Sequence, residues 1–310
     1  MPRTNAAPAV GLALALAFAT GAGLAIQAYV NGRLSASLGS TELAVAVNNI
    51  IGLTLLLALG VGTGALTRGL SRARSGAPSR WWHFLGGPCG ALLVYVAAKA
   101  APEIGVAVLT VAIVCGQTGG SLAVDRAGLS PAGRRAMTPA RGIGVALAVV
   151  AVLISTTGRK GELDLVLLAF AVLAGGVSAL QQAANGQLAA TTGEPVAAGF
   201  VNFAIGCSIL TAVALVVTGG DAPNGWSAPA PQWIGGAFGV AVVVVAAWAV
   251  SSLGVLRLSL AVIAGQSAGA LVIDLIAPAA GEVITAATVL GVALTLVAVV
   301  ISGRGRIEGS

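Results

Sequence analysis

The sequence predicts an all-α integral membrane protein with ten transmembrane helices, arranged as two inverted five-helix repeats. Three observations lead to this fold class. Of the 310 residues, 57% are hydrophobic and only 8% are charged, and the mean hydropathy is +0.97. Apolar segments of about 20 residues, the length that crosses a bilayer, follow one another along the whole chain. Rare polar residues recur in the same order in both halves of the chain.

The composition decides which classes of protein can be set aside. A soluble protein carries roughly 25% charged residues. A chain with 8% cannot cover a surface in water, so its main solvent is lipid. The net charge of +6 is therefore not a signal for nucleic acid, which is not an expected partner. Cys89, Cys115 and Cys207 lie in apolar runs without metal-ligand spacing and are predicted to be small core residues.

Ten apolar segments are separated by glycine, proline and charged residues. They cover residues 9–32, 42–66, 82–100, 103–125, 141–157, 163–187, 195–217, 232–251, 254–277 and 284–302. The clearest polar breaks lie at residues 68–80, 128–139, 158–164 and 219–231. The first segment begins like a signal peptide, but its apolar run is longer than a signal core, so we expect it to remain as the first span.

The stretch GLAIQAYVNGRLSASLG, residues 23–39, has a twin at residues 175–193, GGVSALQQAANGQLAATTG. At this offset of 154 residues, Gln27 matches Gln181, Asn31 matches Asn185, and Asn48 matches Asn202. Further on the offset is 149, and GQTGGSLAVD at residues 116–125 matches GQSAGALVID at residues 265–274. This second match pairs Gln117 with Gln266 and Asp125 with Asp274. Glutamine, asparagine and aspartate are too rare in this chain for such matches to arise by chance.

The matches divide the chain into two repeats and a tail. We expect a first five-helix repeat at residues 9–157, a second at 163–302, and a short cytoplasmic tail at 303–310. Because five is an odd number of crossings, the second repeat enters the membrane from the opposite side, and the two repeats are inverted.

The positive-inside rule assigns an orientation to this topology. The side of the N-terminus carries 12 arginines, and the opposite side carries 4 lysines and arginines. The first set is Arg3, Arg68, Arg72, Arg74, Arg80, Arg126, Arg134, Arg135, Arg141, Arg257, Arg304 and Arg306; the second is Arg33, Lys99, Arg159 and Lys160. Both termini are therefore predicted to lie in the cytoplasm, with the chain in the inner (plasma) membrane.

Eight amide side chains within the spans are the candidate solute-binding residues. An amide without a hydrogen bond in hydrocarbon costs about 2–7 kcal/mol, so these helix faces should point inward. The eight are Gln27, Asn31, Asn48, Gln117, Gln181, Asn185, Asn202 and Gln266. If the repeats pack about a pseudo-twofold axis, we expect them to converge on the repeat interface, where inverted-repeat transporters bind their substrates. The alternative is a set of interhelical hydrogen bonds, each worth about 0.6 kcal/mol.

Asp125 and Asp274 are the candidate residues for proton or cation coupling. They are the acidic residues nearest the interior of the spans, and they occupy matching positions in the two repeats. The alternative is a role at a helix end or in a salt bridge, since Asp125 adjoins Arg126.

The sequence does not support an enzyme, a cofactor or a metal ion. Gly265, Ser267 and Gly269 fit the G-x-S-x-G pattern of hydrolases, which requires a strand-turn-helix elbow and a histidine. Here the pattern lies inside an apolar helix, and His83, the single histidine, lies beside two tryptophans at the cytoplasmic edge of a span. There is no G-x-x-x-x-G-K-[ST] phosphate-binding loop and no His/Cys/carboxylate cluster with metal-ligand spacing.

The paired elements Q-x-x-x-N-G-x-L…G…N-x-x-x-G and G-Q…D resemble those of the drug/metabolite transporter superfamily, and within it the bacterial YdcZ-type branch in its ten-span fused form. The resemblance covers residues 9–302 and implies two inverted halves, cytoplasmic termini and alternating access to a central cavity. Small multidrug exporters of this superfamily use a glutamate in the first helix. This chain has Gln27 and Gln181 in the corresponding region, which disfavours proton-coupled cation export and favours a neutral, zwitterionic or anionic solute.

We therefore expect a membrane transporter, an exporter or exchanger of a small organic solute. Its expected partners are the lipid bilayer and the solute, with protons as a candidate coupling ion and a homodimer left open. The alternatives from other classes are a non-transporting membrane scaffold or subunit, and a passive channel.

Overall fold

The computed structural model describes residues 6–75, 79–129, 133–134, 137–157, 164–278 and 284–304, without the side chains of residues 6–9, 246–257 and 302–304. In these ranges the regular secondary structure is helical throughout and contains no strand. The α-helices are α1 (Ala6–Leu38), α2 (Thr41–Gly62), α3 (Ala65–Ser75), α4 (Gly86–Ile104), α5 (Val106–Ala127), α6 (Pro139–Ser155), α7 (Leu165–Thr192), α8 (Pro195–Thr218), α9 (Gly235–Ile276) and α10 (Ala286–Arg304). Two short 3₁₀-helices, η1 (Trp81–Leu85) and η2 (Ala230–Ile234), precede α4 and α9.

Seven of the described helices are long and apolar enough to cross a membrane, and three further apolar helical segments are shorter. The seven are Val10–Leu38, Thr41–Gly62, Trp81–Ile104, Val106–Ala127, Leu165–Thr192, Pro195–Thr218 and Leu258–Ile276; the three are Pro139–Ser155, Ala230–Val245 and Ala286–Ile301. Many large apolar side chains face outward, for example Val216, Leu165 and Leu153. An all-helical bundle with an apolar exterior agrees with the predicted class of membrane protein.

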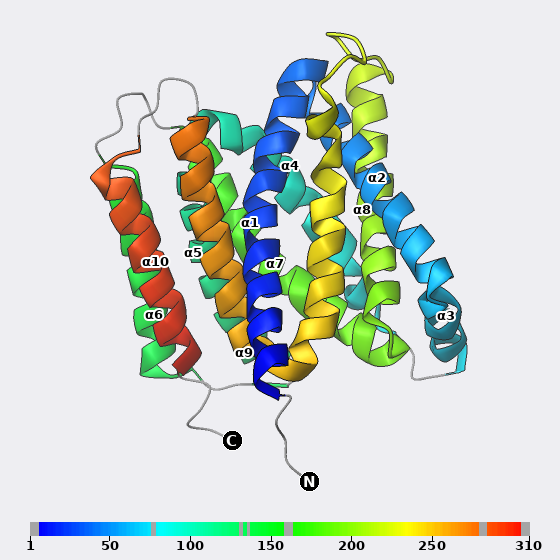
Figure 1. The fold of residues 1–310 in the computed structure, drawn as a ribbon, viewed down its shortest axis with the longest axis horizontal. Coiled ribbons are helices and arrows are strands. Elements are labelled where there is room, and N and C mark those ends of the chain that lie inside the picture. Colours follow the sequence, from blue (N-terminus) through cyan, green and yellow to red (C-terminus); the bar gives the residue numbers. More distant parts are fainter. Residues whose placement is uncertain are drawn as a thin grey trace.

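Helix α9 has two arms, which correspond to the two segments that the sequence analysis expected at residues 232–251 and 254–277. Its 42 residues are assigned to a single helical element. A straight helix of this size would be about 63 Å long, roughly twice the hydrocarbon thickness of a bilayer. Figure 1 shows instead that its first arm (residues 235–245) and its second arm (Leu258–Ile276) run in opposite directions on either side of α1.

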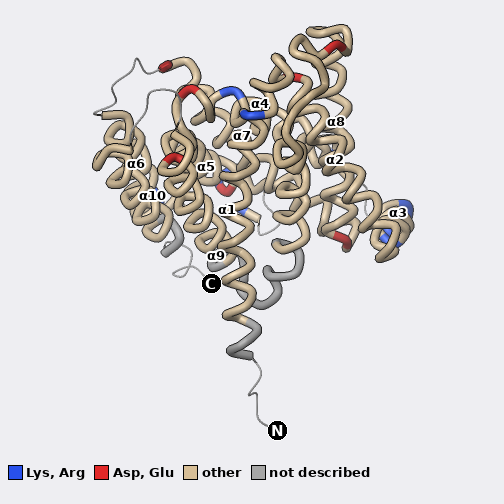
Figure 2. Tube along the Cα trace, turned by 45° about the horizontal axis from the view of Figure 1, so that its top comes forward, with Lys and Arg blue, Asp and Glu red and all other residues tan. Residues whose placement is uncertain are grey.

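Helix α3 was missed by the sequence analysis, which treated residues 68–80 as a polar break. The segment is an amphipathic helix whose Ala65 and Gly69 are buried, while its arginines point outward. An average over a long hydropathy window cannot separate such a helix from a polar loop, because only the periodicity of the apolar residues distinguishes them. Figure 2 shows basic residues, the arginines of this helix, gathered on α3 at the edge of an otherwise largely uncharged bundle.

The two ends of the bundle are distinguished by these elements. The start of α1, the end of α10 and α3 lie at one end, which we call the α3 end (Figure 1). The corner between α1 and α2 and the segment of residues 219–234 lie at the opposite end, which we call the η2 end (Figure 1). The equivalent corner between α7 and α8 contacts α3 and therefore lies at the α3 end.

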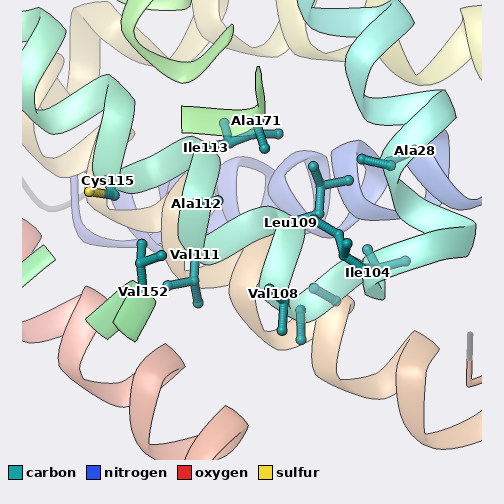
Figure 3. Close-up of a cluster of buried hydrophobic side chains, with 14 of the residues drawn as sticks. Ala28, Ile104, Val108, Leu109, Val111, Ala112, Ile113, Cys115, Val152 and Ala171 are labelled. Atoms are coloured by element: carbon teal, nitrogen blue, oxygen red, sulfur yellow. The ribbon is translucent and has the colours of Figure 1, made fainter. Parts of the chain in front are cut away.

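Helix α5 forms the centre of the main hydrophobic core. It has the largest buried share of the seven long apolar helices. Its residues 106–115 are buried against α1, α4, α6, α7, α9 and α10. Figure 3 shows Val111 beside Val152 of α6 and Ile113 beside Ala171 of α7. Small and β-branched residues dominate this core, so the helices approach one another closely.

Two helix crossings leave no room for a side chain. A Cβ atom added to Gly116 of α5 would lie 1.8 Å from the carbonyl oxygen of Val172 in α7. A Cβ atom on Gly265 in the second arm of α9 would lie 1.9 Å from the carbonyl oxygen of Phe18 in α1. Gly116 and Gly265 are matched positions of the twin sequences, so the same kind of backbone contact is made twice.

The crossing of α5 and α7 leads to a first prediction. Gly116→Ala places a methyl group against backbone, and we expect it to lower the free energy of unfolding by about 1–3 kcal/mol. The matched control is Gly119→Ala on the same helix, where nothing lies within 4 Å of the added Cβ atom. We expect this control to leave stability unchanged or to raise it by up to about 1 kcal/mol. Thermal unfolding of both purified variants in detergent measures the difference, and equal midpoints would contradict the tight crossing.

Candidate functional site

The first amide cluster consists of Gln27, Asn31 and Asn48, together with residues at the start of α9. The side-chain Nδ2 of Asn48 donates to Oδ1 of Asn31 at 2.8 Å and to the backbone carbonyl of Gln232 at 3.2 Å. Both asparagines are 1% exposed. The cluster therefore joins the hairpin of α1 and α2 to η2.

Glycines at the start of α9 allow this contact. A Cβ atom on Gly235 would lie 2.1 Å from Oδ1 of Asn31, and one on Gly236 would lie 1.9 Å from the carbonyl oxygen of Asn48. One turn later, a Cβ atom on Gly239 would lie 3.3 Å from Nε2 of Gln27. The pattern of Gly235 and Gly239, which from the sequence is expected to form a helix-packing face of small residues, therefore makes room for amide side chains.

The second amide cluster consists of Gln181, Asn185 and Asn202 with the start of α4. Asn202 donates from Nδ2 to Oδ1 of Asn185 at 2.9 Å. A Cβ atom on Gly86 would lie 2.2 Å from Oδ1 of Asn185, and one on Gly90 would lie 2.6 Å from Nε2 of Gln181. The second cluster thus repeats the first, with α7 and α8 in place of α1 and α2, and α4 in place of the first arm of α9.

The sequence analysis expected the eight amides to converge on the interface between the repeats. Six of them form two clusters, the first toward the η2 end and the second toward the α3 end, because α1 and α7 end at opposite ends of the bundle (Figure 1). Gln117 and Gln266 belong to neither cluster; each follows a crossing glycine, on α5 and on the second arm of α9 respectively.

The contact between α2 and α8 connects the two clusters. Phe203 of α8 lies against Gly52 of α2 and against Gly239, whose Cβ positions would be 2.6 and 2.9 Å from its ring. The equivalent contact is made in the other direction. Asn49 of α2, which the offset of 154 residues pairs with Phe203, lies against Gly206 of α8, and its Nδ2 would be 3.3 Å from a Cβ atom added there. The sequence analysis did not single out Asn49 or Phe203, although the offset of 154 residues pairs them next to Asn48 and Asn202.

The asparagines and glutamines have different surroundings. The asparagines hydrogen-bond to one another in pairs. The side chains of Gln27, Gln117, Gln181 and Gln266 are partly exposed, and within the described residues they make no hydrogen bond. Four amides therefore keep their donors and acceptors available, while the four asparagines are engaged in the structure.

Asp125 and Asp274 are both buried and both engaged. Asp125 accepts a hydrogen bond from the guanidinium Nη2 of Arg141, which is also buried, and not from the adjacent Arg126. Asp274 accepts bonds from the backbone N–H groups of Val106 at 2.9 Å and Ala107 at 2.7 Å, and so caps the N-terminus of α5. A positive partner and the positive end of a helix dipole each stabilise a carboxylate that would otherwise be buried alone.

The corners of the two hairpins are held by different chemistry. At the α3 end, Nε of Arg68 donates to Oε1 of Glu194 at 2.6 Å, and Nη1 of Arg72 donates to the carbonyl of Gly193 at 3.1 Å. At the η2 end, the backbone and side chain of Asn224 donate to the carbonyls of Leu38 and Ala36, both at 3.2 Å. An arginine-carboxylate pair at one end thus has a neutral counterpart at the other.

Other sequence candidates take structural places. Cys89, Cys115 and Cys207 are free and buried, as predicted. Ser267 lies inside α9 and is 1% exposed, so its G-x-S-x-G sequence does not form a nucleophile elbow. The search for groups of three metal-ligating side chains over the described residues finds none.

Comparison with known proteins places the chain in a family. A family model described as "Putative inner membrane exporter, YdcZ" matches residues 12–154 and 166–301. The chain belongs to this family. The family is one of inner membrane exporters and not of enzymes, and together with the apolar helical bundle it identifies a multi-pass transport protein of the inner membrane.

A solved structure shares the fold of this YdcZ-family protein. It is titled "Crystal structure of protein", is 19% identical in sequence, and aligns over 97% of this chain and 99% of its own chain with a TM-score of 0.56. No curated protein matches the chain.

The ion pair of Arg68 and Glu194, which joins α3 to the corner of α7 and α8, leads to a second prediction, on the pH dependence of stability. The hydrogen bond from Arg68 lowers the pKa of Glu194 below its ordinary value. A lowered carboxylate pKa stabilises the folded state above the unfolded pKa of about 4.3, and this contribution is lost as the pH falls through the lowered value. Glu194→Gln should therefore lower the unfolding midpoint of this family member at pH 7 by a small amount, and the difference should disappear in acid.

The matched control is Arg74→Gln, on the same helix, which should leave the midpoint at pH 7 unchanged. Thermal unfolding of the three proteins between pH 3 and 7 provides the measurement. If Glu194→Gln behaves like Arg74→Gln, the bond between Arg68 and Glu194 does not stabilise the fold.

Proposed function

We propose that this YdcZ-family protein transports a small organic solute across the inner membrane, as an exporter or exchanger, by alternating access. The family description supports export in general. The observation that carries the proposal is the pair of amide clusters, in each of which the hairpin of one half packs its asparagine pair on the glycines that begin a helix of the other half. In the first cluster a hydrogen bond from Asn48 to Gln232 also joins the two. Such joints hold one end of a bundle together while the other end separates.

We propose ten crossings in two inverted repeats, residues 9–157 and 163–302, with both termini in the cytoplasm. The family model matches in two consecutive segments, which supports a duplication. The equivalent contacts of Gly116 and Gly265, and of Gly86 and Gly235, support a pseudo-twofold relation. The arginines of α3 support a cytoplasmic α3 end.

We propose the eight amides as the solute-binding residues, with the four glutamines as the direct contacts. An amide offers both donors and acceptors, which suits a neutral, zwitterionic or anionic solute rich in hydrogen-bonding groups. The asparagine pairs contribute by holding the helices that carry Gln27 and Gln181 in place. The partly exposed glutamines need a hydrogen-bonding partner within the membrane, and a polar solute or water supplies it.

The glutamines lead to a third prediction, tested in proteoliposomes loaded with a panel of radiolabelled amino acids, sugars and organic acids. For any solute that is transported with saturation, Gln27→Leu and Gln181→Leu should each lower transport by about five- to tenfold, since each loses a hydrogen bond worth roughly 1–1.5 kcal/mol. The control is Gln182→Leu, the exposed neighbour of Gln181, which should transport normally.

Equal rates in all three variants would exclude the glutamines as solute contacts. Conductance without saturation would favour a passive channel, and correctly folded protein without any transport would favour a scaffold.

The acidic residues lead to a fourth prediction. We propose Asp125 and Asp274 as the candidates for proton coupling, and each would have to exchange its present partner for a proton during the cycle. If they couple, Asp125→Asn and Asp274→Asn should abolish the dependence of transport on a pH gradient while leaving exchange without a gradient. If the wild type shows no response to the gradient, transport is not coupled to protons.

A further inference from the structure

The helices η1 and η2 occupy equivalent positions, 149 residues apart. Each contains a backbone hydrogen bond at the same place, from His83 to Arg80 at 3.0 Å and from Gln232 to Pro229 at 2.9 Å. Each continues into a long helix at a glycine with nearly the same dihedral angles, φ −51° and ψ −43° at Gly86 and φ −52° and ψ −42° at Gly235. His83 and Gln232 are therefore structurally equivalent residues.

Gln232 fastens η2 to the hairpin of α1 and α2. Its side-chain Oε1 accepts a hydrogen bond from the hydroxyl of Ser37 at 2.8 Å, and its backbone carbonyl accepts one from Asn48 at 3.2 Å. The residue is 8% exposed. At the η2 end the joint between the halves is thus closed by two bonds to one residue.

His83 has neither of these bonds within the described residues. It is 5% exposed, and its Nδ1 is buried without a hydrogen-bond partner. Thr191, the equivalent of Ser37, donates to the carbonyl of its own helix at Leu188, at 3.0 Å. Asn202, the equivalent of Asn48, donates to Asn185. His83, the single histidine of the sequence, is therefore buried without a hydrogen bond at Nδ1. Its counterpart Gln232 is buried with two hydrogen bonds.

The surroundings of His83 offer no described counter-ion for an imidazolium. Helix η1 packs against α4, α7 and α8. Helix α7 contains no titratable residue, the only one in α8 is Cys207, and those in α4 are Cys89, Tyr95, Lys99 and Glu103, the last three more than three turns away along the chain. Arg80, which begins η1, adds a like charge, and Glu194 at the corner of α7 and α8 is bonded to Arg68. A charged imidazole at this position would be buried without compensation.

We propose that His83 is a proton-dependent positioning residue for the second amide cluster. While His83 is neutral, η1 stays packed against α7, and Gly86 stays in contact with Asn185. Protonation introduces a charge that the apolar joint cannot hold, and η1 moves away from α7 together with the start of α4. Histidine is the side chain that titrates between about pH 5 and 8, so the α3 end responds to pH, while the η2 end, with Gln232 in the equivalent place, does not. The proposal rests on the proposed function insofar as the second cluster is the joint that opens during transport.

Cys89 is a reporter for this movement. It lies one turn into α4, between Gly86 and Gly90, and is 7% exposed. We would reconstitute the full chain with Cys115→Ala and Cys207→Ala in liposomes and measure the rate of alkylation of Cys89 by N-ethylmaleimide between pH 5.5 and 8. The same measurement is made on His83→Gln, which places at position 83 the residue found at the equivalent Gln232. Dividing the rate of the first protein by the rate of this variant removes the effect of the titration of the thiol itself.

The ratio of the two rates should be constant above about pH 7.5 and should rise at least about threefold toward pH 5.5, as protonated His83 shifts the population toward the open joint. Gln232→His serves as the matched control and should leave the rate at Cys89 unchanged. A ratio that does not vary with pH would overturn the proposal and leave His83 a structural residue. If His83→Gln does not fold, His83→Asn takes its place.

A second measurement detects the proton itself. The rings of Trp82 and His83 meet edge to face with centroids 4.4 Å apart, and a protonated histidine quenches the fluorescence of a neighbouring indole. In a chain with Trp82 as its single tryptophan, emission should fall as the pH falls from 8 to 5, and His83→Gln should remove the change. Neither measurement uses a solute, so a failure to find a transported compound would affect the proposed function and not this inference.

Discussion

The constraint on which this structure depends is that an amide within the membrane needs a hydrogen-bonding partner. Asn31 and Asn48 meet part of this need in one another, although the Oδ1 of Asn48 is buried without a hydrogen-bond partner, and Asn185 and Asn202 also form a bonded pair. An asparagine pair can form only if the helix packed on it leaves room, and that helix begins with glycine in both cases, at Gly235 and at Gly86. The buried amides therefore explain the glycines. A side chain at Gly235 or Gly86 would collide with the asparagine pair and break the hydrogen bond that offsets the cost of burying the amides.

The sequence predicted the class of fold well, because composition and the length of apolar runs depend directly on the lipid solvent. It failed where a local property mattered more than an average. Helix α3 was missed because an amphipathic helix and a polar loop have similar mean hydropathy. The two segments expected at 232–251 and 254–277 correspond to the two arms of α9, because Ser251, Ser252, Gly254 and Arg257 interrupt the apolar sequence between them.

The twin sequences identified which amides correspond but not how they are arranged. Matching sequences do not say how far each pair lies from the pseudo-twofold axis, and the structure has two clusters, which the contact between α2 and α8 connects. Asp125 forms a salt bridge, the alternative that the sequence left open, but its partner is Arg141, which α6 brings there, and not the adjacent Arg126. Gln232 could have been found, because the offset that pairs Gly86 with Gly235 also pairs it with His83.

The differences between the two ends carry more information than their likeness. Both ends need a residue that fastens a hairpin corner, and the α3 end uses Arg68 and Arg72 where the η2 end uses Asn224. Both ends need a residue at the turn into a helix, and one uses histidine where the other uses glutamine. In each case the α3 end has the ionisable group. The two joints are therefore nearly alike in shape and different in charge, and the one histidine of the sequence, the side chain that titrates between about pH 5 and 8, lies in the joint at the α3 end.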